Sequence, residues 1–208
     1  LFFALASDPD LAPRRAVLND QNHELVTMYE VVRDQLDELV SQLEPLVTRY
    51  LAADAETRAE IFYAVRGEQP TTAIEVAARL LFLNKTCFNG LYRVNQRGLF
   101  NVPHGKYKNP TILDPVVLAA ASRALQHTEL LSGDFEAACA NAKPGDFVYF
   151  DPPFHPLSDT ANFTSYTAGA FAREDQLRLR WCMDGLRDRG VPVMLSNSPH
   201  EWIVGVYE

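Results

Sequence analysis

The sequence has few cysteines, and none of them lies in a pattern that predicts a disulfide framework or a metal site. Cys87, Cys139 and Cys182 are widely separated and odd in number, whereas a disulfide scaffold or a Cys-x-x-Cys zinc site needs paired spacing. The five histidines show no pair at the spacing of metal ligands. We therefore expect buried or half-buried thiols and no metal.

Long hydrophobic runs are also lacking. Hydrophobic residues make up 47% of the 208 residues and charged residues 22%, which is ordinary for a soluble globular protein. The opening LFFALA has neither the basic flank nor the length of a signal peptide. We expect a cytoplasmic protein of one domain with a large insertion. Since no exposed amphipathic helix stands out, we also expect a monomer without a membrane partner.

Acidic residues are absent from Val76 to Leu113, although the whole chain has a net charge of -8. This segment carries six basic residues, whereas the rest of the chain carries 13 basic and 27 acidic residues. The net charge alone argues against a passive nucleic-acid binder. The basic segment on an acidic body instead predicts a local surface that faces phosphate. A basic loop that is merely solvated is the alternative.

Strand and helix signals alternate in the order of βαβ units, which predicts an α/β core. The expected strands are short apolar runs, each followed by polar residues: residues 16–19, 128–133, 147–150 and 191–198. Helical spacing of apolar residues predicts helices over residues 20–43, 114–125 and 173–189. Pro45 should break or kink the first of these. Thr72 and Glu75 form the signature of a capping box that opens another helix.

The strand at 147–150 ends in Asp151-Pro152-Pro153-Phe154. A carboxylate and a carbonyl at a strand end, with prolines that offer no N–H, form a rigid turn rich in acceptors. Such a turn suits a planar ligand with an amino group: Asp151 and the Pro152 carbonyl accept its two hydrogens, and Phe154 stacks on its ring. The alternative is that the two prolines end a strand and Asp151 caps the next turn.

These residues resemble the Dam-type adenine-N6 DNA methyltransferases, whose signature is Asp-Pro-Pro-Tyr or Asp-Pro-Pro-Phe. Three other stretches are similar to the family in the same order: TCFNGLYRVNQRGLFNVPHGKYKNP to its target-recognition segment, LSGDF to its contact with the cofactor adenine, and FTSYTAGAFAREDQLRL to the run after the catalytic loop. The resemblance covers most of the chain, and the stretch 86–110 is specific to the Dam-like branch.

The resemblance implies a Rossmann-like methyltransferase sheet with a mostly helical target-recognition insertion. Residues 1–34 and 112–208 would form the catalytic core and residues 35–111 the insertion. It implies S-adenosyl-L-methionine as cofactor and double-stranded DNA as partner, in a prokaryotic or phage setting. Asp151, Pro152, Pro153 and Phe154 would hold an adenine that is flipped out of the duplex, and they would keep the N6 lone pair available for methylation.

The cofactor residues are expected at strand ends. Asp20 follows the first strand, where an acidic residue accepts from the ribose hydroxyls in nucleotide-binding sheets; the alternative is a helix cap for the segment that begins near Asn22. The resemblance implies that Asp134 and Phe135 contact the adenine of the cofactor. Without it, Gly133-Asp134 is an ordinary turn. Asp151 also belongs to the expected cofactor site.

The resemblance also implies DNA contacts within the stretch 86–110. Phe88 and Asn89 would fill or probe the duplex near the extruded base, and Arg93 would bind a guanine edge. The other expected contacts are with thymine methyl groups, phosphates or neighbouring bases: Leu91, Pro103, Lys85, Asn95, Arg97, Lys106 and Lys108. GATC is the expected site, and His104 falls where an aromatic residue can stand in the family.

Two alternatives stay open at this point. One is a DNA-binding module that kept the fold without catalysis, and the other is an amino-methyltransferase acting on RNA or a protein amide, which would usually carry Asn-Pro-Pro-Tyr. The family's aromatic-x-Gly-x-Gly cofactor loop is absent from this sequence. We therefore expect the chain to be a fragment, incomplete at both ends of the catalytic core, with weak cofactor binding and poor turnover when alone.

Overall fold

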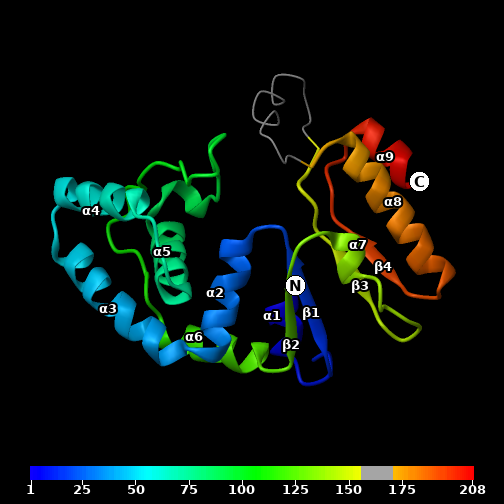
Figure 1. Cartoon of the computed structure of the whole chain (residues 1–208), viewed down its shortest axis with the longest axis horizontal. Coiled ribbons are helices and arrows are strands. Elements are labelled where there is room, and N and C mark those ends of the chain that lie inside the picture. The colour runs from blue at the N-terminus through cyan, green and yellow to red at the C-terminus, as the bar shows by residue number, and fades with distance from the viewer. Residues whose placement is uncertain (156–170) are drawn as a thin grey trace. The chain divides into compact units, whose positions relative to one another are not determined.

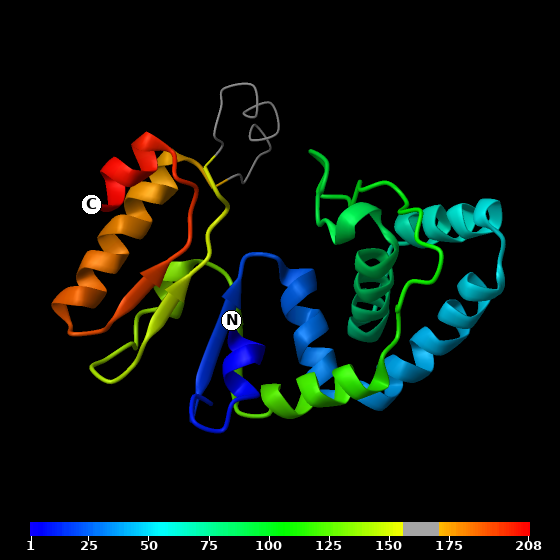
Figure 2. The same cartoon turned by 180° about the vertical axis from the view of Figure 1, so that it is seen from behind.

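The computed structural model describes residues 1–155 and 171–208. The chain divides into two compact units, Leu1–Gly133 and Asp134–Glu208. The F-x-x-Y run at 163–166, which contributes to the resemblance, lies outside the described residues. Figures 1 and 2 show the helices and strands of both units from opposite sides.

The first unit contains a parallel pair of strands. β1 (Ala16–Asp20) and β2 (Thr128–Ser132) align with Leu18 opposite Leu130. Parallel strands need a long crossover connection, and here it consists of helices. Both strands lie where the apolar runs predict them, and each is followed by the polar residues that the sequence places there.

The helices of the first unit begin at residues with polar side chains in four cases. Asn22, Asp54, Thr72 and Asp114 each accept a hydrogen bond from a backbone amide in the first helical turn, which satisfies donors that a helix start leaves free. The bounds are α1 (Phe2–Ala6), α2 (His23–Asp34), α3 (Leu36–Ala52), α4 (Ala55–Gly67), α5 (Ala73–Thr86), the 3-10 turn η1 (Phe88–Gly90) and α6 (Pro115–Leu125). The capping box between Thr72 and Glu75 is confirmed.

The helix expected over residues 20–43 is two helices, and the break is not at Pro45. The chain leaves helical geometry at Gln35, with φ -139° and ψ 42°, and α3 then continues through Pro45. Pro45 is exposed, whereas Leu39, Leu43 and Val47 on the same helix are buried. The packing of that apolar face stabilises α3 despite the backbone donor that proline lacks.

Aromatic side chains form the centre of the first unit. Tyr50, Phe62 and Phe82 are fully buried, and the rings of Tyr50 and Phe82 meet edge to face at 5.2 Å. They come from α3, α4 and α5, which Figure 1 shows next to one another. This helical body carries the segment that follows α5, so residues 86–110 leave from a rigid support.

The second unit is a smaller α/β layer. Its elements are α7 (Phe135–Ala138), β3 (Val148–Phe150), α8 (Arg173–Asp188), β4 (Val193–Leu195) and α9 (Glu201–Tyr207). β3 and β4 are parallel, with Phe150 opposite Leu195. The buried residues Phe150, Leu179 and Leu186 join the strands to α8. The strands and the helix expected here are confirmed.

The fold is thus a mixture of helices and parallel strands, as the sequence predicts. Each unit contains one two-stranded parallel sheet, which is compatible with a methyltransferase fold. A larger Rossmann-like sheet stays a prediction, as do the limits of the insertion at residues 35–111. The helices α3, α4 and α5 fall within those limits.

Candidate functional site

The Asp-Pro-Pro-Phe turn begins where β3 ends. Phe150, the last residue of β3, is 7% exposed and belongs to the core of the second unit. Its carbonyl oxygen accepts a hydrogen bond from the amide of Ser196 at 3.0 Å, which extends the ladder beyond β4. Asp151 follows at once and is exposed. The turn therefore lies at the carboxyl end of a parallel strand, where open α/β sheets bind ligands.

The carboxylate of Asp151 is oriented by the neighbouring strand. The hydroxyl of Ser196 donates a hydrogen bond to Asp151 Oδ1, and the hydroxyl of Tyr149 donates to Ser196 Oγ at 3.0 Å. A carboxylate has about four acceptor positions on its two oxygens, so this contact leaves capacity for a ligand's amino group. Ser196 is not among the residues predicted from the sequence, where its signal is a polar residue directly after a predicted parallel strand.

The remainder of the turn is held by its backbone. Pro153 O accepts a hydrogen bond from Gln176 Nε2 at 3.4 Å, and the amide of His155 donates to Asn197 Oδ1 at 3.2 Å. Among the described residues, the carbonyl of Pro152 has no hydrogen-bond partner. The side chain of Phe154 is 57% exposed. One carbonyl acceptor and one aromatic face are thus presented next to Asp151.

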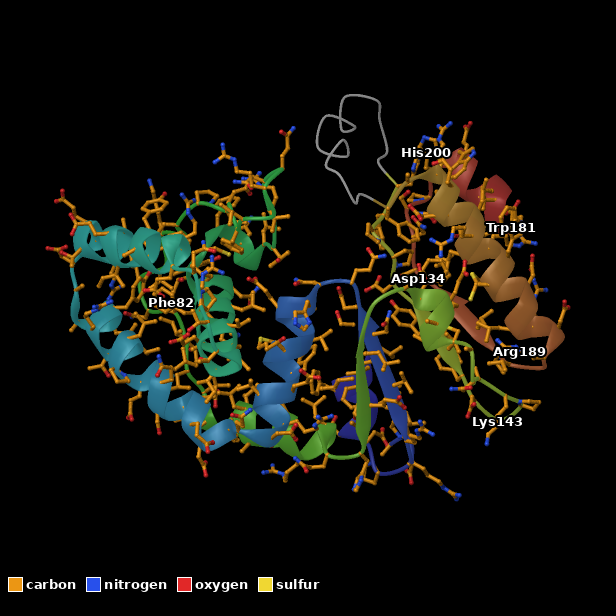
Figure 3. The ribbon with its side chains drawn as sticks, viewed as in Figure 1. Phe82, Asp134, Lys143, Trp181, Arg189 and His200 are labelled. Atoms are coloured by element: carbon orange, nitrogen blue, oxygen red, sulfur yellow. The ribbon has the colours of Figure 1, made fainter. Side chains whose placement is uncertain are left out.

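Asp134 and Phe135 lie at the start of α7 in the same unit as the turn (Figure 3). Asp134 Oδ1 accepts from the Glu136 amide at 2.9 Å, and Arg178 Nη2 lies 2.8 Å from Asp134 Oδ2. The hydrogen bond from Arg178 lowers the pKa of Asp134, so this carboxyl stays ionised at neutral pH. Asp134 therefore presents a fixed, negatively charged acceptor.

The ring of Phe135 lies between this carboxylate's ion-pair partner and β3. It meets Phe150 edge to face at 6.5 Å, and the guanidinium of Arg178 lies over the Phe135 ring at 5.1 Å. Phe150 directly precedes Asp151 in the chain. The structure therefore brings Asp134, Phe135 and the predicted catalytic turn together within the second unit.

Asp20 is the last residue of β1 in the first unit and is exposed. Its Oδ1 accepts from the amide of Asn22 at 2.7 Å, and its carbonyl accepts from the Gly133 amide at 3.1 Å. The cap of α2 is Asn22, so the alternative of Asp20 as that helix cap is not what the structure has. The side chain of Asp20 stabilises the turn between β1 and α2.

Residues 86–110, called the basic loop below, form an irregular antiparallel hairpin. Its two ends are joined by hydrogen bonds from the Phe88 amide to Pro103 O at 2.9 Å and from the Gly105 amide to Thr86 O at 2.8 Å. A Cβ atom on Gly105 would lie 2.8 Å from the Cys87 carbonyl oxygen, closer than packing allows. Gly105 thus permits the close approach of the two strands.

Most of the predicted DNA-contacting side chains are exposed, on the basic loop or, for Lys85, in the last turn of α5. Phe88 and Leu91 are each 50% exposed. Asn89 has a left-handed backbone with φ 53°, which asparagine tolerates better than most residues. The other exposed members of the set are Lys85, Arg93, Arg97, Pro103, Lys106 and Lys108. The surface thus combines apolar side chains with cations, as contact with bases and phosphates requires.

Asn95 and Arg93 are held within the basic loop. Asn95 is half-buried, and its Oδ1 accepts from the amides of Arg97 and Leu99 at 2.9 and 3.1 Å; its oxygen therefore shapes the turn. Arg93 Nε donates to Asn101 Oδ1 at 2.7 Å, and Arg93 Nη2 donates to Asn101 O at 3.3 Å. Nη1 of Arg93 has no partner among the described residues. The edge formed by Nε and Nη2 is thus fixed by Asn101, and Nη1 is left to contact a ligand.

Two other residues of this region have structural roles. Arg79, one of the six cations, is 6% exposed and donates to Val65 O and Arg66 O. His104 forms a hydrogen bond with the hydroxyl of Tyr50 at 2.7 Å, and its ring lies 5.1 Å from that of Phe62. Burial, followed by the charge of Arg58, lowers the pKa of His104. His104 therefore anchors the basic loop to α3 and α4, whereas Arg79 joins α5 to the end of α4.

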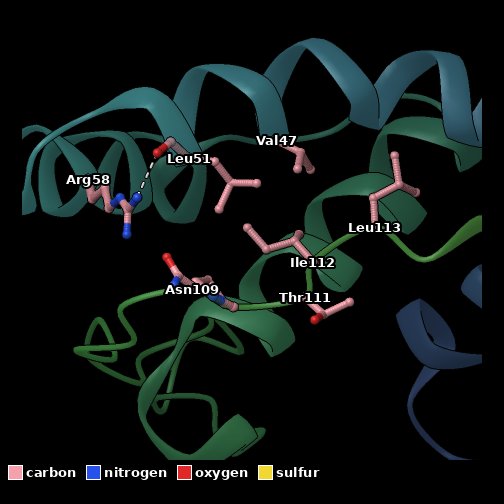
Figure 4. A pocket seen from close by; sticks show the side chains of 8 residues that line it. Val47, Leu51, Arg58, Asn109, Thr111, Ile112 and Leu113 are labelled. Carbon is pink, nitrogen blue, oxygen red and sulfur yellow. Dashed lines mark hydrogen bonds between the residues drawn. The ribbon is translucent and has the colours of Figure 1, made fainter.

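A cavity of about 420 Å³ lies between α3 and residues 109–113 (Figure 4). Arg58 stands at one end of it and donates to Leu51 O at 2.6 Å. The lining consists of Val47, Leu51, Arg58, Asn109, Pro110, Thr111, Ile112 and Leu113. None of the predicted site residues is among these.

Two kinds of feature are absent from residues 1–155 and 171–208. No helix there is both long and apolar enough to cross a membrane. Likewise, this part of the chain contains no group of three or more histidine, cysteine, aspartate or glutamate side chains arranged to hold a metal ion.

The sequence is similar to a known protein family and to several known proteins, all of which are named as methyltransferases or methylases. Residues 1–208 match the family described as D12 class N6 adenine-specific DNA methyltransferase. The chain is 42% identical over 190 residues to a type II methyltransferase, M.MjaIII, of Methanocaldococcus jannaschii, covering 89% of this chain and 66% of the relative. It is 43% identical over 197 residues to the type II methyltransferase M1.LlaDCHI of Lactococcus lactis, covering 91% and 67%.

A third relative is the DNA adenine methylase of Escherichia coli K12. It is 36% identical over 185 residues, which cover 88% of this chain and 64% of the relative. The chain thus spans about two thirds of the length of the curated relatives that it matches.

Proposed function

The chain belongs to the D12 class of N6 adenine-specific DNA methyltransferases, and we propose that the protein transfers a methyl group to the N6 atom of an adenine in double-stranded DNA. The observation that carries this proposal is the turn at residues 151–154. It presents a carboxylate, a carbonyl without a partner among the described residues and an exposed aromatic ring at the end of β3. Those three groups match the amino group and the ring face of adenine.

The turn activates the amino group by accepting its hydrogens. The N6 lone pair of adenine is delocalised into the ring, which makes N6 a poor nucleophile. Asp151 and the Pro152 carbonyl each accept one N6 hydrogen and keep the lone pair available, while Phe154 stacks on the base. Since N6 has to enter a pocket, the adenine is flipped out of the duplex.

S-adenosylmethionine is the proposed methyl donor, and it supplies an electrophilic methyl group on a sulfonium when bound. Asp134 suits the adenine moiety, because its carboxylate is fixed by Arg178 and each oxygen retains a further acceptor position. Phe135 adds a half-buried aromatic side chain beside it. Asp20 is the proposed acceptor for the ribose hydroxyls, on the chemistry of an exposed carboxylate at a strand end.

The basic loop is the proposed DNA-reading surface. Arginine pairs with the O6 and N7 atoms of guanine, and apolar side chains contact the thymine methyl group. Arg93 would therefore read guanine, and Leu91 and Pro103 would contact thymine. Lys85, Arg97, Lys106 and Lys108 would contact phosphates, while Phe88 and Asn89 would occupy the space near the flipped base. GATC is the proposed target.

The proposal is tested with labelled S-adenosylmethionine and three acceptors of equal adenine content: a duplex containing GATC, a duplex with the site scrambled, and an RNA duplex of the same sequence. The complete protein is expected to label only the first. Label in both DNA duplexes would contradict the proposed site but not the reaction. Label in the RNA alone would contradict DNA as substrate, and duplex binding without label would favour a binding module.

A further inference from the structure

Gln176 on α8 is a buried polar side chain that the sequence analysis did not select. It is only 1% exposed, although the helix around it is rich in charged residues on its solvent face. Burying an amide without hydrogen bonds is unfavourable, so the hydrogen-bond partners of Gln176 determine what it contributes. Those partners lie in the predicted catalytic turn, after β4 and in α9.

The side-chain amide of Gln176 makes three hydrogen bonds and keeps one Nε2 hydrogen without a partner among the described residues. Its Oε1 accepts from Asn197 Nδ2 at 3.1 Å and from the hydroxyl of Tyr207 at 2.8 Å. Its Nε2 donates to Pro153 O at 3.4 Å. Burial raises the pKa of Tyr207 to about 12, so the hydroxyl remains a donor at neutral pH. The three side chains form one connected network.

The network holds the turn at two points. Gln176 binds the carbonyl of Pro153, and Asn197, oriented by Gln176, accepts from the amide of His155 at 3.2 Å. Both points come within a few residues of Asp151 and Pro152. The Pro153 carbonyl and the His155 amide are therefore both held in place. The rings of Pro152 and Pro153 leave little torsional freedom between these groups and the Pro152 carbonyl, so the direction of that carbonyl is restricted.

Stability alone does not require this arrangement. Replacing a buried polar network by apolar side chains of similar volume is often neutral for stability, whereas a fully connected network specifies one geometry. A displacement of about 1 Å in a group that aligns a reactant can cost about 100-fold in rate. The benefit of Gln176 is therefore expected in the alignment of the turn.

We propose that Gln176 is a positioning residue for methyl transfer: through Pro153, Asn197 and Tyr207 it sets the direction of the Pro152 carbonyl and the place of Asp151. This inference rests on the proposed function. Gln176 is buried and contacts the turn through the Pro153 carbonyl. Its loss should therefore lower kcat and leave the binding of DNA and of cofactor nearly unchanged.

The first experiment compares Gln176→Met with Gln42→Met in the complete protein. Methionine is similar to glutamine in length, and Gln42 is an exposed residue of α3 without side-chain hydrogen bonds among the described residues. Gln176→Met is expected to lower kcat about 10-fold to 100-fold, with KM for a GATC duplex within about twofold of wild type. Equal kcat in the two variants, or a loss confined to KM, would overturn the inference.

A second variant covers the case in which Gln176→Met unfolds the unit. Tyr207→Phe removes one donor to Gln176 and keeps the ring, so it should fold and lower kcat by a smaller factor, about threefold to tenfold, for the loss of about 1 kcal/mol of hydrogen bonding. Full wild-type kcat in Tyr207→Phe would contradict a role for the network.

Hydrogen exchange tests the positioning without any activity. The amide hydrogen of His155 is held by Asn197, so its exchange, followed by NMR, should be at least about tenfold faster in Gln176→Met and unchanged in Gln42→Met. Unchanged exchange in Gln176→Met would overturn the inference even if the wild-type protein proved inactive, and inactivity of the wild type would by itself count only against the proposed function.

Discussion

The hydroxyl of Ser196 donates a hydrogen bond to the carboxylate of Asp151, so the residue that follows β4 orients the residue that follows β3. The two strands are parallel and end at the same edge, which is why residues 45 positions apart in the sequence meet there. The donor therefore fixes the direction of one oxygen of Asp151.

Removing this hydroxyl should slow methyl transfer. Ser196→Ala is expected to lower kcat about tenfold, because a hydrogen bond to a charged group contributes about 1.5 kcal/mol. Ser196→Thr should restore most of the rate. Ser198→Ala is the matched control, since Ser198 Oγ is buried without a hydrogen-bond partner among the described residues. Single-turnover rates on a GATC duplex measure the effect, and equal rates in the two alanine variants would refute it.

Arg178 should support cofactor binding through Asp134. Arg178→Met removes the ion pair and the cation over Phe135, and we expect the Kd for S-adenosylmethionine to rise about fivefold, because the lost ion pair is partly exposed to solvent. Calorimetry measures the affinity. Arg187→Met on the same helix is the control, because Arg187 contacts only Asp184 at 3.6 Å among the described carboxylates. An affinity unchanged in Arg178→Met would show that Asp134 does not act in the cofactor site.

Arg93 should determine specificity and not only affinity. Arg93→Lys is expected to lose about 1–3 kcal/mol of discrimination at the guanine that it reads, because lysine lacks the planar pair of donors. The measurement is kcat/KM on GATC and on a duplex with 7-deazaguanine at that position. Lys85→Ala should instead weaken binding to both duplexes equally and reduce the salt slope by about one. A uniform loss in Arg93→Lys would identify it as a phosphate contact.

His104 should make the stability of the first unit depend on pH. Its pKa is lowered by burial, so the unfolded chain binds the proton more readily as the pH falls through about 6.5. This contribution is present above that pH and is lost below it. The free energy of unfolding should therefore fall between pH 7.5 and 5.5, and His104→Phe should show a smaller fall.

Denaturant titrations at pH 7.5 and 5.5 measure how steeply the free energy of unfolding depends on pH. His155, in the second unit, also has a lowered pKa, mainly from burial, so the chain as a whole should retain part of its pH dependence in His104→Phe and less in a double variant with His155→Phe. A slope in His104→Phe equal to that of wild type would contradict the assignment of His104 as a buried neutral anchor.

The sequence predicts helices and strands well where the pattern of apolar residues lies within one short stretch of the chain. The four strands are short apolar runs that end in polar residues, and each was found because alternation with helices leaves few other interpretations. Gln35 was missed as a break because nothing in its residue type ends a helix, whereas Pro45 was overrated because a proline on an exposed face costs less than the packing around it gains.

The site was predictable only in part for the same physical reason. Asp151 and Phe154 stand out because their chemistry lies in one short stretch. Ser196 and Gln176 contact that stretch through strand pairing and helix packing across the unit, and such contacts depend on register and on which face a helix buries. His104 was expected in the DNA-reading loop, and its burial against Tyr50 became clear only with the packing of α3.

The most direct test of the account is the rate at which the complete protein forms N6-methyladenine in a GATC duplex when Asp151 is replaced by asparagine. Asp151→Asn keeps the size of the side chain but substitutes a neutral amide for the anionic acceptor. At saturating cofactor, the single-turnover rate should fall about 100-fold to 1,000-fold, as when an electrostatic contact to a reacting group is removed, while the duplex binds with nearly wild-type affinity. An Asp151→Asn protein that methylates adenine at the wild-type rate would contradict the central claim.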